Sequence, residues 1–483
     1  MKNIHISIII HIIGVCLIIE SLFIFIDIPI SIIFHDGTFI PLLESSAITF
    51  LSGIILFLLS KSNSYKKPSI KESFLIVTLS WLLISVFGTL PYILSSSIGN
   101  FSDAFFETVS GFTTTGSSVI TDIESLPKGI LFWRSETHWI GGMGIIALVI
   151  FILPSLKVSG NQLFSAEGSF FNVEKIRPRL VDVVKRLWAI YIILTVAEIV
   201  LLILADMNWF DAICHSFATI ATGGFSTKNT SIANYSATIQ YIIILFMFLS
   251  GMNFILHYLF LHCRFKKAFK NEELRTYFLI VIIITLILTY TNFPIYKSLE
   301  KSFRNSLFQL VSIITATGFI SSDYEQWIPV AKQLLFFSMF IGACVGSTGG
   351  GIKIARHIIL IKSLRIQFVK SIHPNAIVPI RYNKKLVNEK VITSISSFIM
   401  IYFLTFVVGS FIMMITGLDP KSAFSSVITT LGGIGPGFGE VGPLNNFSGI
   451  SDFGKYYLSF NMILGRLEII SVLSILRRSF YKV

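Results

Sequence analysis

Long runs of apolar residues limit what this chain can fold into. The run from Phe278 to Thr289, FLIVIIITLILT, offers no polar helix face that could be turned toward water. The 483-residue chain is 53% hydrophobic and has a mean hydropathy of +0.77, more apolar surface than a soluble core would bury. The sequence therefore predicts an all-α integral membrane protein, whose first apolar run, from Ile4 to Phe34, is a spanning helix rather than a cleaved signal peptide.

The distribution of basic residues predicts the topology. A net charge of +12 could suggest nucleic-acid binding, but the Lys and Arg residues gather between apolar segments instead of along one face. Five clusters lie at 61–71, 157–186, 264–275, 362–390 and 477–482. They follow every second full-length apolar span, which is the positive-inside pattern. We therefore expect a multi-pass protein with both termini in the cytoplasm and no nucleic-acid partner.

Four segments would then lie on the outer side, at 96–129, 206–237, 292–330 and 418–455. These segments are rich in Asp and Glu. An acidic vestibule would concentrate cations, although each acid could equally be an ordinary solvated loop residue.

A short motif ending in glycine recurs in each outer segment, with glycines at 116, 223, 318 and 432. The apolar stretch before each glycine has roughly ten residues, too short to cross a hydrocarbon core of about 30 Å. The repeated unit is therefore predicted to be a spanning helix, a half-helix, a polar loop and a second spanning helix. Non-helical backbone at membrane depth must be buried in protein or line a water-filled path.

Four such loops can meet on one axis and form a ring of carbonyl oxygens. Thr and Ala are small enough for four strands to converge, Thr hydroxyls can add oxygen ligands, and Gly permits the backbone angles required. The half-helices would direct their partially negative C-terminal ends to the same point, which favours a cation. The alternative is four ordinary helix C-caps, which explains one motif more easily than four in register.

A glycine-rich run at 346–351 interrupts an apolar span expected from about 330 to 362. It nearly matches a phosphate-binding loop, but Ile352 separates Gly351 from Lys353 and no strand precedes it. These glycines should break the helix, and a break at this depth must line a cavity, unless it is only a flexible packing kink.

Two charged residues lie within apolar spans. Arg466 would place a guanidinium in the membrane, where it requires a partner and could form an electrostatic barrier in a cation path, or could pair with Glu468. Glu198 is either a polar pathway residue or a buried, hydrogen-bonded glutamate.

These motifs together resemble those of the Trk potassium-uptake family, of the TrkH/TrkG type within the Trk/Ktr/HKT superfamily. The resemblance covers nearly the whole chain. Its motifs are FWR at 132–134, HWIGGMG at 138–144, ATGGFS at 221–226, TATGF at 315–319, GSTGGGIK at 346–353, GGIGPG at 432–437 and GRLE at 465–468.

The resemblance implies two leading transmembrane helices (1–66) and four pore repeats (67–157, 158–264, 265–372 and 373–483) around a central pore. It implies potassium uptake across a bacterial inner membrane, with K⁺ as the bound substrate and neither a catalytic site nor a cofactor in this chain. It also implies a homodimer in membrane lipid and a cytosolic TrkA-type regulatory ring that carries the nucleotide, ATP/ADP or NAD/NADH.

The resemblance further implies two sets of site residues. The potassium-binding filter would comprise Thr114, Thr115, Gly116, Ala221, Thr222, Gly223, Thr315, Ala316, Thr317, Gly318, Thr430, Leu431 and Gly432. The gate would comprise Gly346, Ser347, Thr348, Gly349, Gly350, Gly351, Lys353 and Arg466. Leu431 stands where the other repeats are expected to have Thr, so the ring is predicted to depart from fourfold symmetry.

Two other functions fit a membrane protein of this kind. The resemblance implies that a sodium-coupled or sodium-permeable relative would be favoured by Ser at the first filter glycine, so Gly116 argues against that function. A membrane-embedded enzyme for lipid-linked substrates would need a His, Asp or Glu cluster near one interface, which the sequence does not show.

Overall fold

The computed structural model describes residues 4–60, 68–152 and 177–481, and α-helices dominate this part of the chain. In chain order the elements are α1 (Ile6–Phe34), α2 (Phe39–Leu59), α3 (Ile70–Phe87), α4 (Leu90–Leu94), α5 (Phe101–Phe112), α6 (Lys128–Ile152), α8 (Arg177–Leu204), α9 (Trp209–Ile220), α10 (Ala237–Ser250), α11 (Phe254–Leu261), α12 (Phe265–Ala268), α13 (Glu272–Tyr296), α14 (Leu299–Ile314), η2 (Tyr324–Gln326), α15 (Pro329–Ser338), α16 (Ile354–Ile372), β1 (Arg381–Tyr382), β2 (Lys385–Leu386), α17 (Glu389–Ile415), α18 (Pro420–Gly432), η3 (Gly439–Val441), α19 (Asp452–Arg466), α20 (Ile469–Ile475) and α21 (Arg478–Tyr481).

Six helices in the described ranges are long and apolar enough to span a membrane, and two bent helix pairs could each add a span. The sequence predicts about ten spans. The remaining two candidates are α6, which has 25 residues but carries Lys128, Arg134 and Glu136, and the pair α15 and α16, which is interrupted between 338 and 354.

The second spanning segment is broken in three repeats, although the sequence predicts only the break at 346–351. Helices α10 and α11 meet at 106°, and α19 and α20 meet at 118°. At the second bend Glu468 has φ +68°, a left-handed conformation. Arg466 is therefore the last residue of α19 rather than a mid-helix residue. Three repeats therefore carry irregular backbone in the second spanning segment, and at membrane depth such backbone must be buried in protein or line a path.

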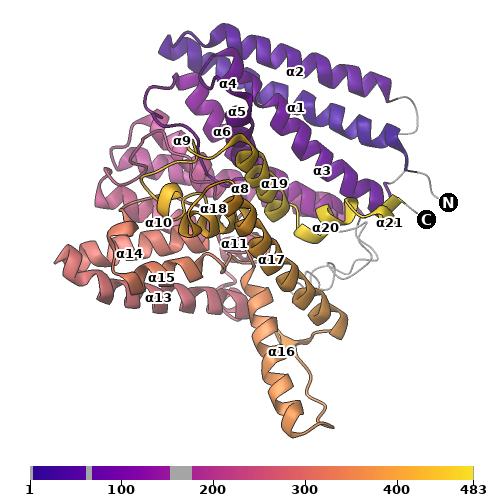
Figure 1. Ribbon diagram of the computed structural model, residues 1–483, viewed down its shortest axis with the longest axis vertical. Helices are drawn as coiled ribbons and strands as arrows, with labels where there is room; N and C mark the ends of the chain where they lie inside the picture. The colour runs from indigo at the N-terminus through magenta and orange to yellow at the C-terminus, as the bar shows by residue number, and fades with distance from the viewer. Residues whose placement is uncertain (1–3, 61–67, 153–176, 482–483) are drawn as a thin grey trace.

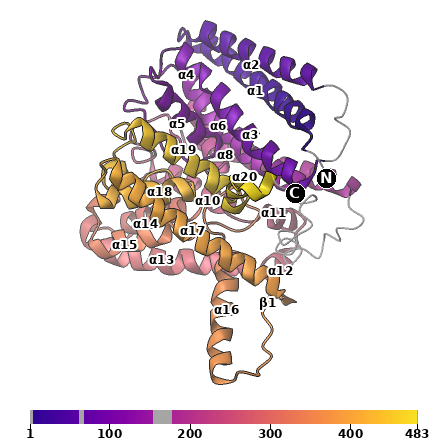
Figure 2. The same ribbon diagram turned by 45° about the vertical axis from the view of Figure 1, so that its right-hand side comes forward.

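Helices α1, α2 and α3 lie side by side on one flank of the bundle, and α16 projects from it in both views (Figures 1 and 2). Close packing of α1 on α2 depends on Gly14 and Gly53, since a Cβ on Gly14 would lie 2.9 Å from the carbonyl oxygen of Gly53. The start of α3 and the C-terminal α21 share one end, where Lys71 Nζ lies 5.6 Å from the centre of the Phe480 ring.

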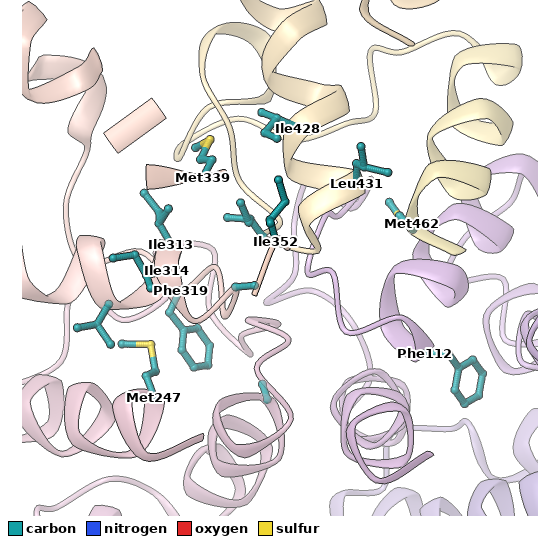
Figure 3. Packing of buried hydrophobic residues seen from close by; sticks show 14 of the residues in the cluster. Phe112, Met247, Ile313, Ile314, Phe319, Met339, Ile352, Ile428, Leu431 and Met462 are labelled. Atoms are coloured by element: carbon teal, nitrogen blue, oxygen red, sulfur yellow. The ribbon is translucent and has the colours of Figure 1, made fainter. Parts of the chain in front are cut away.

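Apolar side chains fill the centre of the bundle around the short helices and the loops after them. Figure 3 shows Ile313 and Ile314 of α14, Ile428 and Leu431 of α18, and Phe319 among these buried residues. The core therefore holds the outer half-helices against the spanning helices.

Candidate functional site

Four short helices lead to the four glycine loops. They are α5, α9, α14 and α18, with 12, 12, 16 and 13 residues. Each begins at a polar N-cap whose side chain accepts a backbone N–H, and these caps are Asn100, Asn208, Ser298 and Asp419. The expected half-helix is therefore present in every repeat.

Each loop has the same backbone pattern, in which two residues with positive φ flank one residue without it. The pairs are Thr114 and Gly116 (53° and 81°), Thr222 and Gly224 (55° and 80°), Ala316 and Gly318 (58° and 82°), and Gly433 and Gly435 (68° and 92°). An alternating backbone of this kind turns successive carbonyl groups toward one side of the chain, as a carbonyl-lined filter requires.

The second residue of each pair is a glycine, and it lies so close to a neighbouring loop that an added Cβ would meet a carbonyl oxygen there. The four approaches, glycine first, are Gly116 to Gly223 at 2.1 Å, Gly224 to Thr317 at 2.0 Å, Gly318 to Ile434 at 2.0 Å and Gly435 to Thr115 at 2.8 Å. Because the fourth approach returns to the first loop, the four loops form a closed ring. A side chain at any of these glycines would push two loops apart.

The ring corrects the expected alignment in two repeats. Gly116 and Gly318 occupy equivalent places as predicted, but their counterparts are Gly224, one residue after Gly223, and Gly435, three residues after Gly432. Where a sequence has adjacent glycines, only the contacts with neighbouring loops decide which glycine takes the strained conformation.

Repeat four needs the larger correction. Thr430 and Leu431 lie inside α18, where the Thr430 hydroxyl donates to the Ser426 carbonyl at 2.7 Å and Leu431 is buried in the apolar core (Figure 3). Leu431 therefore does not replace a threonine ligand. The residue equivalent to Thr115 is Ile434.

Threonine hydroxyls line only two of the loops at this level. The Oγ1 atoms of Thr113 and Thr115 lie 2.8 Å apart, and those of Thr315 and Thr317 lie 2.7 Å apart. The equivalent of Thr115 is Gly223 in repeat two and Ile434 in repeat four. The side chains of the ring are therefore not fourfold symmetric, and the departure from symmetry arises at Gly223 and Ile434 rather than at Leu431.

Neighbouring loops are also joined outside the ring. One hydrogen bond at each junction illustrates this: Arg134 Nη1 to the Ser226 carbonyl at 2.9 Å, Ile232 N to the Ile320 carbonyl at 3.0 Å, Tyr324 Oη to the Gly437 carbonyl at 2.7 Å and Phe447 N to the Ser118 carbonyl at 2.8 Å. Each bond crosses from one repeat to the next, which fixes the loops relative to one another.

Several acidic residues in the segments around the loops form ion pairs. Asp103 lies 2.5 Å from Lys455, and Glu325 lies 2.7 Å from Lys421. Although partial burial acts to raise the pKa of Glu325, hydrogen bonds from Lys421 and from the Gly439 amide hold that pKa below its usual value. Such pairs tie repeats together and reduce the negative field that the same acids would produce if unpaired.

The glycine-rich run lies directly beneath the ring. A Cβ on Gly349 would lie 2.5 Å from the Thr315 carbonyl oxygen, and one on Gly350 would lie 2.2 Å from the Gly432 carbonyl oxygen. The Thr348 hydroxyl donates to the carbonyl of Ile220, the last residue of α9, at 3.0 Å. The run therefore contacts the C-terminal ends of three of the four short helices.

Arg466 holds this run in place. Its Nη1 donates to the Thr348 carbonyl at 2.8 Å, and its Nη2 donates to the Gly141 carbonyl of α6 at 3.1 Å. The alternative pairing with Glu468 does not occur, because Glu468 forms its ion pair with Arg356. Arg466 is 8% exposed and donates to the Thr348 carbonyl, so its charge lies inside the protein beside the glycine-rich run.

Sequence reasoning did not identify Glu273, which anchors both stems of the glycine-rich run. Its Oε1 accepts the backbone N–H of Val345 at 2.8 Å and that of Ala355 at 3.1 Å. Between these stems, the Lys353 ammonium donates to the Gly349 carbonyl. In the sequence, the only signal is a Glu at the start of an apolar segment. The backbone groups that it binds, those of Val345 and Ala355, are distant in sequence.

Glu198 is buried on α8, which packs against α9. Its role stays a prediction. Within the described ranges no three His, Cys, Asp or Glu residues cluster to hold a metal ion. The oxygens available at the ring are therefore backbone carbonyls and threonine hydroxyls, which suit a weakly hydrated monovalent cation.

Comparisons with known proteins agree with this architecture. A family model described as the cation transport protein TrkH matches residues 45–480. The chain is 38% identical over 486 residues to the Trk system potassium uptake protein TrkH of Escherichia coli (strain K12), which covers 99% of this chain and 100% of the relative. It is 32% identical over 499 residues to the Trk system potassium uptake protein TrkG of the same strain, with all of both chains covered.

A solved structure matches the whole fold. The crystal structure of the potassium transporter TrkH from Vibrio parahaemolyticus superimposes with a TM-score of 0.91 at 35% identity, covering 99% of this chain and 100% of that one. Together with the sequence matches, this likeness confirms the predicted membrane transporter fold. The chain belongs to the TrkH family of cation transport proteins.

Proposed function

We propose that this protein carries K⁺ inward across a bacterial cytoplasmic membrane through the ring of four loops. The observation that carries the proposal is the closed ring of glycine approaches, which leaves carbonyl groups of all four repeats around one axis. The names of the relatives, potassium uptake proteins, support the choice of ion. The membrane potential would drive uptake with about 2.3 kcal/mol per charge per 100 mV.

The loops act as the selectivity filter. Carbonyl oxygens beside Gly116, Gly224, Gly318 and Gly435 replace the hydration shell of the ion, and the C-terminal ends of the short helices add partial negative charge. The Thr115 and Thr317 hydroxyls contribute on two sides.

The glycine-rich run, with Lys353 and Arg466, acts as the gate. Support comes from its position against the ends of α9, α14 and α18, and from the bond between Arg466 and the Thr348 carbonyl. Opening requires the run to move away from the ring, and the glycines permit that change of backbone conformation.

The same proposal includes partners and orientation. The chain forms a homodimer with both termini in the cytoplasm, and a TrkA-type ring that binds the nucleotide docks on the basic inner segments. The relatives are components of a Trk system, which supports a multi-subunit assembly. Of the basic clusters, residues 61–67 and 157–175 lie outside the described residues, whereas 264–275 and 362–390 are described.

Uptake of radiolabelled Rb⁺ into proteoliposomes, with an inside-negative potential, tests this function. We expect saturable uptake above that of empty liposomes, displaced by K⁺ at far lower concentration than by Na⁺. Arg466→Ala, which frees the run below the ring, should increase the rate in the absence of the regulatory partner. If neither protein takes up Rb⁺ in a K⁺-displaceable manner, the proposed function is wrong.

A further inference from the structure

Two side chains of α6 enclose Phe225, the residue that follows Gly224 of the ring. The Arg134 guanidinium carbon lies 3.6 Å from the centre of the Phe225 ring. The His138 imidazole stacks on the same ring with 4.0 Å between centroids and 29° between planes. Arg134 and His138 are four residues apart, so they share one face of the helix. Phe225 is 1% exposed.

Arg134 also connects the first two loops. Its Nε donates to Glu107 Oε1 at 2.7 Å, and its Nη1 donates to the Ser226 carbonyl at 2.9 Å. Glu107 in turn accepts the Ser118 hydroxyl at 3.0 Å and the Val119 amide at 2.9 Å. The Arg134 and Glu107 side chains are 2% and 0% exposed, so this pair is shielded from water and sensitive to loss of either partner.

His138 fixes the second loop at its backbone. Its Nε2 accepts the Phe225 N–H at 3.2 Å, and its Nδ1 lies 2.8 Å from the Gly111 carbonyl, so the geometry requires the neutral ring with the proton on Nδ1. A Cβ on Gly223 would lie 2.4 Å from His138 Cγ. The loop therefore cannot move outward without displacing the imidazole.

The other repeats lack this arrangement. Phe319 is the counterpart of Phe225 in repeat three, but its nearest aromatic partner there, His215, is tilted by 48° at 5.8 Å. Among the described residues no cation lies over the Phe319 ring. Ser117 and Pro436 take the same place in repeats one and four. The enclosure of Phe225 is therefore specific to the contact between repeats one and two.

We infer that Arg134 and His138 are positioning residues that determine ion selectivity by clamping Phe225 and so fixing the separation of the first two loops. The inference rests on the proposed function. A carbonyl ring discriminates between cations by its size and by how firmly its oxygens are held. Releasing Phe225 would let the second loop shift away from Gly116 and admit an ion of different radius.

The test compares Phe225→Leu and Arg134→Lys with wild type in the Rb⁺ uptake assay. Leu keeps apolar volume but has no aromatic face, and Lys keeps the charge beside Glu107 but cannot bond two acceptors in the Arg geometry. Phe132→Leu is the matched control, because Phe132 is buried on α6 and contacts Phe217 instead. The readout is the ratio of the Na⁺ and K⁺ concentrations that halve uptake.

We expect this ratio to fall about fivefold in both clamp variants and to stay at the wild-type value in Phe132→Leu. A lower uptake rate with an unchanged ratio in the folded variants would overturn the inference, because weakening a clamp that fixes the separation of the loops must alter the discrimination between K⁺ and Na⁺. If only one clamp variant elutes as a folded protein in gel filtration, the ratio of Na⁺ to K⁺ concentrations measured for that variant decides whether the inference stands. Wild-type protein without K⁺-displaceable uptake would instead refute the proposed function and, with it, the clamp.

Discussion

Two glycines of repeat four give opposite predictions for the same substitution. Gly435 has φ +92°, and a Cβ there would lie 2.8 Å from the Thr115 carbonyl oxygen. Gly432 ends α18 without positive φ, and the atoms nearest an added Cβ belong to the Ile434 side chain, at 3.1 and 3.3 Å. Gly435→Ala should therefore disturb the ring, whereas Gly432→Ala should not.

The size of the effect follows from backbone strain. A non-glycine residue in an unfavourable φ region costs roughly 1–3 kcal/mol. The loop relieves that strain by turning the Ile434–Gly435 peptide or by moving away from Thr115, and both changes displace carbonyl oxygens of the ring. Because about 1.4 kcal/mol corresponds to a tenfold change in a dissociation constant, the apparent K⁺ affinity should fall by about 5-fold to 150-fold. For Gly432→Ala, the helix preference of Ala, about 1 kcal/mol, offsets a small movement of the flexible Ile434 side chain.

The assay is Rb⁺ uptake into proteoliposomes at increasing K⁺, with gel filtration in detergent to establish that each variant is folded. The K⁺ concentration that halves uptake should rise for Gly435→Ala and remain unchanged for Gly432→Ala. Equal effects of both substitutions, or a larger effect of Gly432→Ala, would refute the assignment of Gly435 to the ring.

Three further predictions concern the gate and the outer loops. Arg466→Met removes two charge-assisted hydrogen bonds to carbonyls, each about 1.5–3 kcal/mol, and should raise uptake at least about fivefold. Glu273→Ala frees both stems of the glycine-rich run and should also raise uptake, with greater protease cleavage of the run, whereas Glu273→Gln, which still accepts an N–H, should stay near wild type. Because Lys421 and a backbone amide lower the pKa of Glu325, its stabilising effect is present above the unfolded-state pKa and is lost as pH falls through the lower folded-state value. The thermal unfolding midpoint of Glu325→Gln should therefore lie below that of wild type at pH 7, and the difference should vanish as the pH falls below the folded-state pKa of Glu325.

The sequence predicts the repeats well because their signals are local. The first apolar run places α1 within a few residues of its observed ends, and the short stretches before the loops are helices as expected. The glycine-rich break near 346 is also observed, because so many adjacent glycines cannot sustain a helix.

What the sequence does not predict depends on contacts between distant segments. Gly223 and Gly224 have the same chemistry, and only the approach to Thr317 selects the second one for positive φ. The bend before Asn253 has a weaker signal, since one glycine (Gly251) followed by one asparagine does not by itself end a helix in the sequence pattern. Glu273 and Glu107 become important only when their backbone partners are placed beside them.

The four loops share a backbone but are supported by different side chains, which is where the asymmetry of the ring originates. One position on the short helices braces the segment after the loop in the first three repeats: Glu107 accepts the Ser118 hydroxyl, His215 Nε2 lies 2.9 Å from Ser226 Oγ, and Gln309 donates to Ser321 Oγ at 3.4 Å. In repeat four a hydroxyl one position earlier, that of Ser425, accepts the Phe438 amide at 2.6 Å.

A carboxylate, an imidazole, an amide and a hydroxyl differ in strength as hydrogen-bonding groups, and only the carboxylate carries a charge that requires a buried partner. Repeat one meets that requirement with Arg134, which reaches across to repeat two. The contact between these two loops is therefore held by a fully buried ion pair as well as by backbone geometry, whereas the ion pairs that link repeat four to its neighbours, Asp103–Lys455 and Glu325–Lys421, are more exposed to solvent. A ring whose glycines are equivalent in conformation can thus be firm on one side and more compliant on the other, without any difference in the carbonyl groups that face the ion.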